Sequence, residues 1–422
     1  SLKSDVVGEN YKNKINRIRK ILRLSKADYI YISAPENVAW ALNIRGSDNP
    51  NSPIPNCRLI IGKTKETFLI TQKEKVSEII KEGKVSNKQI INPNKFKDLI
   101  KKLKGKKFII DPLSCSILNE KIIESKFKII NKHDPCYKLK SKKNWYEIKH
   151  MINAHIADGV ALTKFIYWMK NINKNKITEL ESQKKLEKFR KLNKNYLFPS
   201  FNTISGTGSN GAIVHYRASK KTNKEIKKND IFLCDSGGQY KYGTTDVTRT
   251  VCFSKPSSRI KEIFTRVLKG HIAVVTNNLN KINKGNLIDK KARKSLKAIK
   301  LDYGHGTGHG VGFFSNVHEG PQAISKFNSI QLREGMIVSN EPGYYEEGKF
   351  GIRIENLIYI EKKKNKLKFK NLTLAPIDND LIDKKLLTSK EKDYLLKYNL
   401  EVYKYISPYL NRSEKNWLLK LV

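Results

Sequence analysis

The chain has 422 residues, of which 39% are hydrophobic and 9% aromatic. This length exceeds the roughly 100–200 residues of a usual domain, so we expect two domains, and the hydrophobic content excludes an intrinsically disordered chain. The formal net charge of +43 would suit nucleic acid or an anionic membrane, but it comes mostly from lysines spread along the whole chain. Arginine, which makes bidentate contacts to phosphates and bases, is scarcer, so we expect neither a nucleic-acid partner nor a membrane.

The cysteines and the apolar runs predict a cytoplasmic protein. Five widely spaced cysteines, with no CxxC pair, are typical of reduced thiols. No apolar run approaches the roughly 18 residues that a membrane span needs. The first ten residues also lack the apolar stretch of a signal peptide.

The first 130 residues alternate between helical and strand-like patterns. Apolar residues at helical spacing predict a helix at 10–24, and alternation predicts a strand at 27–33. Two apolar runs around a polar turn predict a strand pair at 57–71. The other expected elements are helices near 73–82 and 95–104 and strands at 107–111 and 127–130. Strands that alternate with helices indicate an α/β domain.

The second part of the chain begins after a polar connector. Residues 131–144 show no periodicity and contain a proline, so we place the domain boundary there. A long amphipathic helix is expected at 145–170. A second helix is expected at 178–192, where a threonine followed three residues later by glutamate forms a capping box.

Residues from about 198 to 360 carry the chemistry. Glycine, threonine, aspartate and histidine concentrate there in strand-like runs, and a further helix is expected near 389–406. The run FLCDSGGQYKYGTTDVTRTV (232–251) predicts a hairpin with its tip near Tyr240 and Lys241, which puts Asp235 directly opposite Asp246. Two such carboxylates repel unless a cation lies between them. An aspartate in a glycine-rich loop can instead cap a turn.

Two histidines follow in a glycine-rich segment. HGTGHGVG (305–312) contains His305 and His309 and has too much glycine for a stable helix, so we expect a loop or strand whose backbone crowds a ligand. The segment differs from the HExxH helix of zinc proteases. His318 lies just before a Gly-Pro turn.

Two glutamates complete a set of hard ligands. Glu341 precedes a Pro-Gly turn, and Glu355 ends the alternating run FGIRIEN. Acids on solvated strand faces are common, but the apolar neighbours of Glu355 indicate a face turned into a polar pocket. Four carboxylates and one imidazole suit Mn(II) or a similar ion better than a thiolate-type zinc site.

The charge of this set favours two metal ions over one. Four carboxylates carry too much negative charge for one divalent ion, so we expect a pair about 3.5–4 Å apart that shares a nucleophilic hydroxide. A serine or cysteine nucleophile is disfavoured, because no GxSxG elbow and no activated cysteine motif occurs.

The ordered motifs resemble those of a known metallopeptidase family. DSGGQYKYGTTDVTRT, HGTGHGVG, VHEGP, EPGYY and GIRIEN are similar to the motifs of the family that contains aminopeptidase P, prolidase and methionine aminopeptidase. TISGTGSNGAIVHYRAS (203–219) and NVAWALNIRGSD (37–48) narrow the resemblance to Xaa-Pro aminopeptidases of the cytosolic, three-domain type.

This resemblance implies the domain organisation. We expect a creatinase-type, ribonuclease-H-like α/β domain at 1–138, an α+β pita-bread catalytic domain at 139–362, and a C-terminal extension packed with it at 363–422. The chain starts where the second domain of the three-domain relatives starts, so we expect their first domain to be lacking. The resemblance further implies a homodimer formed through the catalytic domain.

The resemblance also implies a role for each metal ligand. Asp235 is expected to bind one Mn ion, and Asp246 and Glu355 to bridge both ions. His309 and Glu341 complete the shell of the other ion, and Glu341 acts as the general base.

Further residues are expected to contact the substrate. His215 matches the histidine that steadies the substrate carbonyl and the developing oxyanion. His318 matches a contact to the substrate backbone. His305, Arg353 and Tyr345 are expected on the proline side of the pocket, although His305 can also be read as a satisfied core histidine.

The implied substrate is a peptide with proline at its second position. The bond before proline is a tertiary amide without an N–H, which general aminopeptidases bind badly, and a pocket shaped for the ring turns this into specificity. Three alternatives remain at this stage. They are a prolidase-type dipeptidase, a non-catalytic pita-bread module that binds proteins, and a basic nucleic-acid-binding protein.

Overall fold

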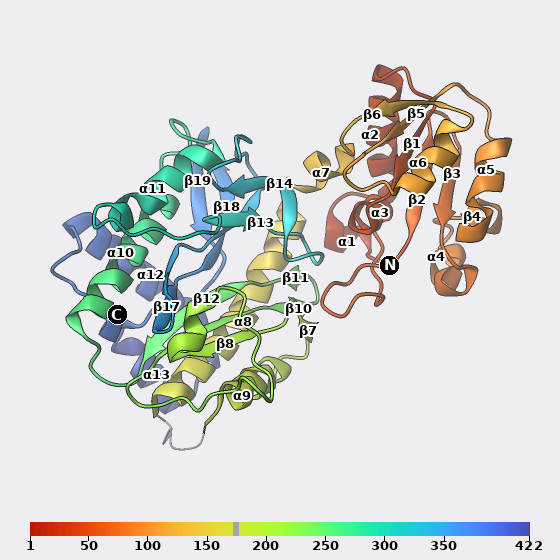
Figure 1. Cartoon of the computed structure of the whole chain (residues 1–422). Helices are drawn as coiled ribbons and strands as arrows, with labels where there is room; N and C mark the ends of the chain where they lie inside the picture. Colours follow the sequence, from red (N-terminus) through yellow and green to blue (C-terminus); the bar gives the residue numbers. More distant parts are fainter. Residues whose placement is uncertain (172–176) are drawn as a thin grey trace. The chain divides into compact units, whose positions relative to one another are not determined.

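A computed structural model describes residues 1–171 and 177–422, which form two compact units (Figure 1). Unit 1 contains Ser1–Lys140 and Asn144–Glu147, and unit 2 contains Ser141–Lys143 and Ile148–Val422. Within the described ranges, no helix combines the length and the apolar character that crossing a membrane requires.

Unit 1 is built on one six-stranded sheet with the order β4-β3-β2-β1-β5-β6. The central strand β1 pairs antiparallel with β2 and parallel with β5. The strands are β1 (Tyr29–Ile32), β2 (Arg58–Gly62), β3 (Thr67–Ile70), β4 (Ile90–Ile91), β5 (Lys107–Ile110) and β6 (Lys128–Asn131). The helices are α1 (Ser4–Val7), α2 (Tyr11–Leu24), α3 (Pro35–Leu42), α4 (Ser77–Lys81), α5 (Phe96–Lys102), α6 (Ile117–Glu124) and α7 (Pro135–Lys140).

Both faces of this sheet are buried, which explains its nearly continuous apolar strands. In β1, Ile30 and Ile32 pack in the cluster that contains residues of α2 and α3. Tyr29 and Tyr31 alternate with them and pack in the cluster that contains residues of α5 and Ile123 of α6. Successive side chains of a strand point to opposite faces, so β1 supplies both hydrophobic layers of an α/β domain.

The structure corrects two predictions for unit 1. The connector predicted at 131–144 contains helix α7, which starts at Pro135, because proline is well suited to the first turn of a helix. The stretch predicted as a helix at 73–82 is split into a 3-10 turn (Lys73–Val76) and the short helix α4. The other predicted strands and helices of this unit are confirmed, and their observed ends lie within two residues of the predicted ends.

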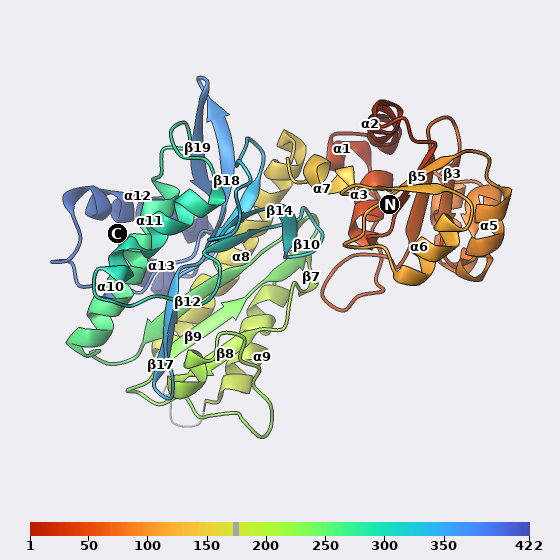
Figure 2. The ribbon, with the colours of Figure 1, turned by 45° about the horizontal axis from the view of Figure 1, so that its top comes forward.

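Unit 2 contains four sheets between two groups of helices (Figure 2). The sheet orders are β11-β10-β7, β12-β9-β8, β14-β13-β15-β18-β19 and β16-β17. The first strands are β7 (Tyr196–Pro199), β8 (Ile204–Thr207), β9 (Ile231–Ser236), β10 (Gly238–Tyr240), β11 (Gly243–Thr244) and β12 (Val247–Cys252). The later strands are β13 (Gly308–Gly310), β14 (Glu319–Ile324), β15 (Ile337–Asn340), β16 (Gly343–Glu346), β17 (Phe350–Arg353), β18 (Asn356–Lys363) and β19 (Lys366–Asn371).

The helices of unit 2 cover the outer faces of these sheets. They are α8 (Trp145–Asn171), α9 (Glu179–Lys191), α10 (Ser258–Val275), α11 (Gly285–Lys297), α12 (Ser389–Ile406) and α13 (Arg412–Leu419). One hydrophobic cluster joins α8 and α9 to β9 and β12. Another joins α10 and α11 to β15, β18 and β19. The inner sheet faces are thereby left for polar side chains.

The prediction that 198–360 consists of strand-like runs is wrong for two segments. Helices α10 and α11 lie inside this range. Ser257 caps α10, and Ile263, Val267 and Leu268 recur at helical spacing and are buried. The capping box of α9 is confirmed, with Thr178 as its first residue.

A buried ion pair ties α8 and α9 to the inner strands. Arg190 on α9 is 1% exposed, and its Nε donates to Asp158 of α8 over 2.7 Å. The Arg190 Nη2 also donates to Ser236 of β9 over 3.0 Å, and the Tyr240 hydroxyl of β10 donates to Asp158 over 2.9 Å. These contacts fix the strand that carries Asp235.

We expect Arg190→Met to lower the free energy of unfolding by about 3–5 kcal/mol, because it leaves the Asp158 carboxylate buried and unpaired. The matched control is Lys397→Met, which removes an exposed ion pair with Asp393 and should cost under about 0.5 kcal/mol. Equilibrium urea unfolding followed by circular dichroism measures both. Equal, small shifts for the two variants would contradict a structural role for Arg190.

Candidate metal centre

A cavity of about 420 Å³ in unit 2 collects most of the predicted site residues. Nine of the ten line it, namely His215, Asp235, Asp246, His305, His309, His318, Glu341, Arg353 and Glu355. Tyr345 is the exception, but its hydroxyl lies 2.9 Å from Nε2 of His305 and 2.6 Å from Nη1 of Arg353. Side chains from several sheets therefore converge on one cavity.

The register of the β9–β12 ladder corrects the predicted aspartate pair. Asp235 lies opposite Thr248, so it is not the direct partner of Asp246. The tip of the hairpin lies one residue further along than predicted, because Tyr240 pairs with Gly243. This change slips the register by two residues, which keeps side chains on the same face. Asp235 and Asp246 are consequently diagonal neighbours, and both reach the cavity.

Asp246, His309 and Glu355 form the tightest group. Each offers one ligand atom, and these atoms lie within 4.8 Å of one another. Nε2 of His309 lies 3.4 Å from Asp246 Oδ2 and 3.5 Å from Glu341 Oε1. Nδ1 of His309 lies 2.9 Å from the Gly310 carbonyl oxygen and donates to it, which leaves Nε2 facing the acids as the ring atom that can bind a metal.

Ser339 holds His309 and Glu341 in place. The Ser339 hydroxyl donates to Glu341 Oε1 over 2.8 Å and accepts the backbone N–H of His309 over 2.8 Å. Gly308 allows this close approach of β13 to β15, because a Cβ at Gly308 would lie 1.9 Å from the Ser339 carbonyl oxygen.

Arg353 and Thr248 form hydrogen bonds that hold two of the acids, Asp235 and Glu355. Arg353 is 2% exposed, and its Nη2 donates to Asp235 Oδ2 over 2.7 Å. The Thr248 hydroxyl accepts from Nε of Arg353 over 3.0 Å and donates to Glu355 over 2.7 Å. The second Asp235 oxygen, Oδ1, is buried without a hydrogen-bond partner among the described residues, which leaves it available to a cation.

The electrostatics of the acids call for cations. Burial raises the pKa of Asp235, Asp246 and Glu355, and the mutual proximity of the acids raises it further for all three. Three or more carboxylates in such a site cannot all ionise together without compensating positive charge. Carboxylate oxygens with one imidazole are a donor set that suits divalent cations such as Mn(II). The residues present therefore fit a metal centre.

The remaining histidines lie around this centre. The ring of His318 lies 4.1 Å from that of His309, and burial lowers the pKa of His318 to about 4, so it is uncharged at neutral pH. His305 is half-buried, its Nδ1 lies 2.7 Å from the Gly306 carbonyl oxygen, and burial lowers its pKa. His215 lines the cavity with an exposed side chain.

Sequence reasoning missed Thr248 and Ser339. Both lie two residues from a predicted ligand, Thr248 from Asp246 and Ser339 from Glu341. Alternation along a strand puts such residues on the face of the ligand, so the period of two could have identified them.

Comparison with family models covers nearly the whole chain. The model of metallopeptidase family M24 matches residues 149–362, and a model of the C-terminal region of that peptidase family matches residues 365–421. A creatinase/prolidase N-terminal domain model matches residues 1–147. Because this N-terminal domain is present, the expectation that the relatives' first domain is lacking gains no support.

Known proteins from several eukaryotes are similar to the chain. An uncharacterized peptidase of Schizosaccharomyces pombe is 39% identical over 96% of this chain and 70% of its own. Aminopeptidase P2 of Arabidopsis thaliana is 37% identical over 97% of this chain and 64% of its own. The chain thus spans about two thirds of the length of these curated relatives.

A solved structure shares the fold over the full chain. The X-prolyl aminopeptidase of Caenorhabditis elegans, described as a cytosolic enzyme with a di-nuclear active site, superposes with a TM-score of 0.90 at 31% identity. The match covers 100% of this chain and 72% of that one. Together with the family models, these matches confirm the predicted fold class. The chain belongs to metallopeptidase family M24 and joins a creatinase-type N-terminal domain to a pita-bread catalytic domain.

Proposed function

We propose that the chain is an Xaa-Pro aminopeptidase, a dinuclear metal hydrolase that cleaves the bond between an N-terminal residue and a following proline. The observation that carries the proposal is the convergence of the four carboxylates and His309 on one buried cavity. Relatives that are named Xaa-Pro or X-prolyl aminopeptidases support the choice of substrate.

The proposed cofactor is a pair of divalent cations, with Mn(II) as the expected metal. Asp235 would hold one ion, and Asp246 and Glu355 would hold both. His309 and Glu341 would complete the shell of the other. When bound, the cations supply the positive charge that activates a water molecule and polarises the scissile carbonyl.

The chain's own residues would handle the protons and the substrate. Glu341, oriented by Ser339, would accept the proton of the attacking water and pass it to the proline nitrogen, which must be protonated before it leaves. His215 would donate a hydrogen bond to the carbonyl oxygen as negative charge develops there. His318, which is uncharged at neutral pH, would contact the substrate backbone.

The proline side of the pocket is proposed to consist of His305, Tyr345 and Arg353. Tyr345 donates a hydrogen bond to His305 and accepts one from Arg353, so these three side chains form a connected wall. A connected wall keeps its shape when the ring binds, which favours a rigid residue such as proline.

Further parts of the proposal concern the whole protein. We propose a catalytic domain at 139–362 with an extension at 363–422, and a cytoplasmic location, which the free cysteines support. A homodimer formed through the catalytic domain is proposed on the family resemblance.

We expect Mn-loaded protein to hydrolyse Ala-Pro-Ala and to leave Ala-Ala-Ala intact. Asp246→Asn should lower kcat/KM about 10³-fold, since a bound metal contributes several kcal/mol to the transition state. The control Asp393→Asn changes an exposed acid of α12 and should keep full activity. Release of alanine is measured by chromatography.

The same assay separates the alternatives. Faster cleavage of the dipeptide Ala-Pro than of Ala-Pro-Ala would indicate a prolidase-type dipeptidase, which needs a free carboxylate next to the ring. Absence of cleavage for every peptide with Mn present would contradict a peptidase.

The raised pKa values of the buried acids should make the metal-free protein lose stability as the pH rises. The folded-state pKa of Asp246 and Glu355 lies above the ordinary values of 3.8 and 4.5. The folded state therefore binds more protons than the unfolded state above about pH 4.5, and stability is lost as the pH rises through the folded-state pKa.

Excess Mn(II) should reverse this trend, because the ions bind the ionised acids of the folded state. The midpoint of thermal unfolding between pH 5 and pH 8, with and without Mn, measures the effect. Glu355→Gln should flatten the pH dependence without metal and weaken the stabilisation by Mn. A metal-free Glu355→Gln midpoint that changes with pH as much as that of the wild type would contradict the raised pKa of Glu355.

A further inference from the structure

A second cavity of about 730 Å³ adjoins the metal centre. Helix α11 and the segments 302–306 and 325–327 line it. His305 and Gly306 line both this cavity and the metal cavity, so the loop that carries them is a shared wall. A bound peptide that passes along His305 can therefore reach the second cavity from the metal cavity.

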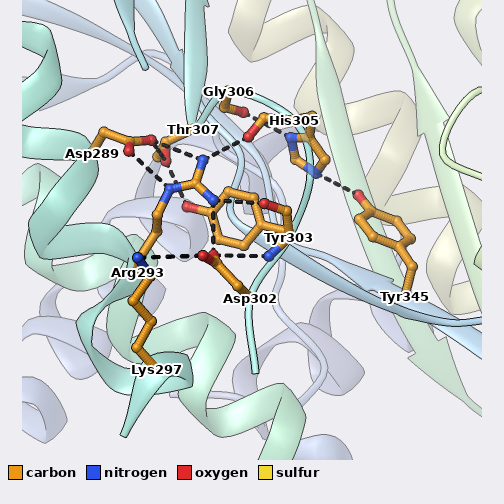
Figure 3. A network of polar contacts seen from close by, with 9 residues as sticks. All are labelled: Asp289, Arg293, Lys297, Asp302, Tyr303, His305, Gly306, Thr307 and Tyr345. Carbon is orange, nitrogen blue, oxygen red and sulfur yellow. Dashed lines mark hydrogen bonds and ion pairs between the residues drawn. The ribbon is translucent and has the colours of Figure 1, made fainter. Parts of the chain in front are cut away.

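Arg293 of α11 fixes this wall (Figure 3). Its Nη2 donates to the His305 carbonyl oxygen over 2.7 Å, and its Nη1 donates to the Tyr303 carbonyl oxygen over 2.6 Å. The guanidinium is also paired with Asp289 over 2.8 Å and with Asp302 over 2.8 Å. Two acids thus neutralise Arg293, and its positive charge is not available to a ligand.

The lysines of the second cavity carry the remaining positive charge. Lys290, Lys294 and Lys297 lie on one face of α11 at spacings of four and three residues, and all are exposed. Lys326 adds a further exposed ammonium group. Among the described residues, Lys290 and Lys294 form no ion pair, and Lys297 has Asp302 at 3.4 Å. The cavity consequently has an excess of positive charge that the protein does not compensate.

The dimensions suit a short stretch of extended peptide. From Lys290 to Lys297, α11 rises by about 10 Å, at 1.5 Å per residue. From its first to its fourth residue, an extended chain also spans about 10 Å. Carboxylates within a stretch of this length can therefore lie along the three lysines.

We propose that this basic cavity is a specificity site that binds acidic residues of the substrate downstream of proline. The inference rests on the proposed function, in which His305 lies on the proline side of the pocket. Residues that follow proline then pass His305 and enter the second cavity, where lysines face their carboxylates. The protein accordingly prefers Xaa-Pro peptides whose following segment is acidic.

The test compares hexapeptides that differ only in charge. Ala-Pro-Ala-Asp-Asp-Asp, Ala-Pro-Ala-Asn-Asn-Asn and Ala-Pro-Ala-Lys-Lys-Lys are each prepared as amides, so that side-chain carboxylates are tested apart from the terminal one. With the Mn-loaded chain, kcat/KM for the Asp peptide should exceed that for the Lys peptide about tenfold, as several exposed ion pairs together allow. Raising the salt concentration should shrink this ratio. Repeating the Asn peptide with a free carboxylate shows what the terminal group adds.

Charge-reversal variants test whether the lysines of α11 cause the preference for acidic peptides. The variant Lys290→Glu, Lys294→Glu, Lys297→Glu should invert the ratio between the Asp and Lys peptides. The matched control Lys362→Glu, Lys363→Glu, Lys366→Glu changes the net charge equally at exposed positions of the β18–β19 hairpin, which line neither cavity. It should keep the wild-type ratio. A ratio is used because a loss of folded protein affects both peptides alike.

Equal kcat/KM for the Asp and Lys peptides in the wild-type chain would overturn the inference, and so would the same change of ratio in both triple variants. Failure of the proposed function gives a different result, namely no cleavage of any peptide. In that case fluorescence anisotropy of labelled Asp peptide decides the inference by itself. The inference is supported if the Asp peptide binds the wild-type chain more tightly than the Lys peptide does and if only the α11 variant loses this preference. Equal binding of the two peptides to the wild-type chain overturns it.

Discussion

The crowding of buried carboxylates is the constraint on which the catalytic unit depends. Asp235, Asp246 and Glu355 are all buried, and burial together with a neighbouring acid raises the pKa of each. The guanidinium of Arg353 contacts one of them and cannot compensate the whole set. A fold that keeps these groups together without bound cations would lose stability at neutral pH. Metal binding and the stability of this unit are therefore linked.

The sheets and helices of unit 2 serve to hold this charge in place. Hydrophobic clusters on the outer faces fix the strands, and the inner faces are thereby free to carry polar residues. The Asp158–Arg190 ion pair fixes β9, because Arg190 also donates a hydrogen bond to Ser236 of this strand. Gly308 lets β13 approach β15 closely enough to bring His309 near Glu341. The proposed ligands Asp235, His309 and Glu341 thus have neighbours that restrict their positions, which would lower the cost of organising the site when metal binds.

The sequence predicted which residues line the cavity better than it predicted their local geometry. Alternation identified the strands of unit 1, and the motifs identified the residues of the cavity. The register of the β9–β12 hairpin could not be predicted, because a tip at Tyr240 and Lys241 and a tip one residue later are equally compatible with the glycine-rich turn. The wrong register does not change the prediction that both aspartates reach the cavity, because a slip of two residues leaves them on the same face.

Other features depend on contacts between distant segments. The helices α10 and α11 were not predicted from the sequence, because the glycine and threonine content of 198–360 favours strands over the region as a whole. Buried apolar residues nevertheless recur along α10 at helical spacing. The basic cavity could not be predicted at all. Its lysines look like any others in a chain with 83 basic residues, and only the fold brings them next to the loop of His305.

The number of metal ions bound per chain tests the central claim most directly. After metal removal, loading with Mn(II) and removal of free metal, elemental analysis should find about two Mn per chain in the wild-type protein and fewer after Asp246→Asn, because this acid is expected to contact both ions. A wild-type chain that retains no metal, or an Asp246→Asn chain that retains as much as the wild type, would contradict the account.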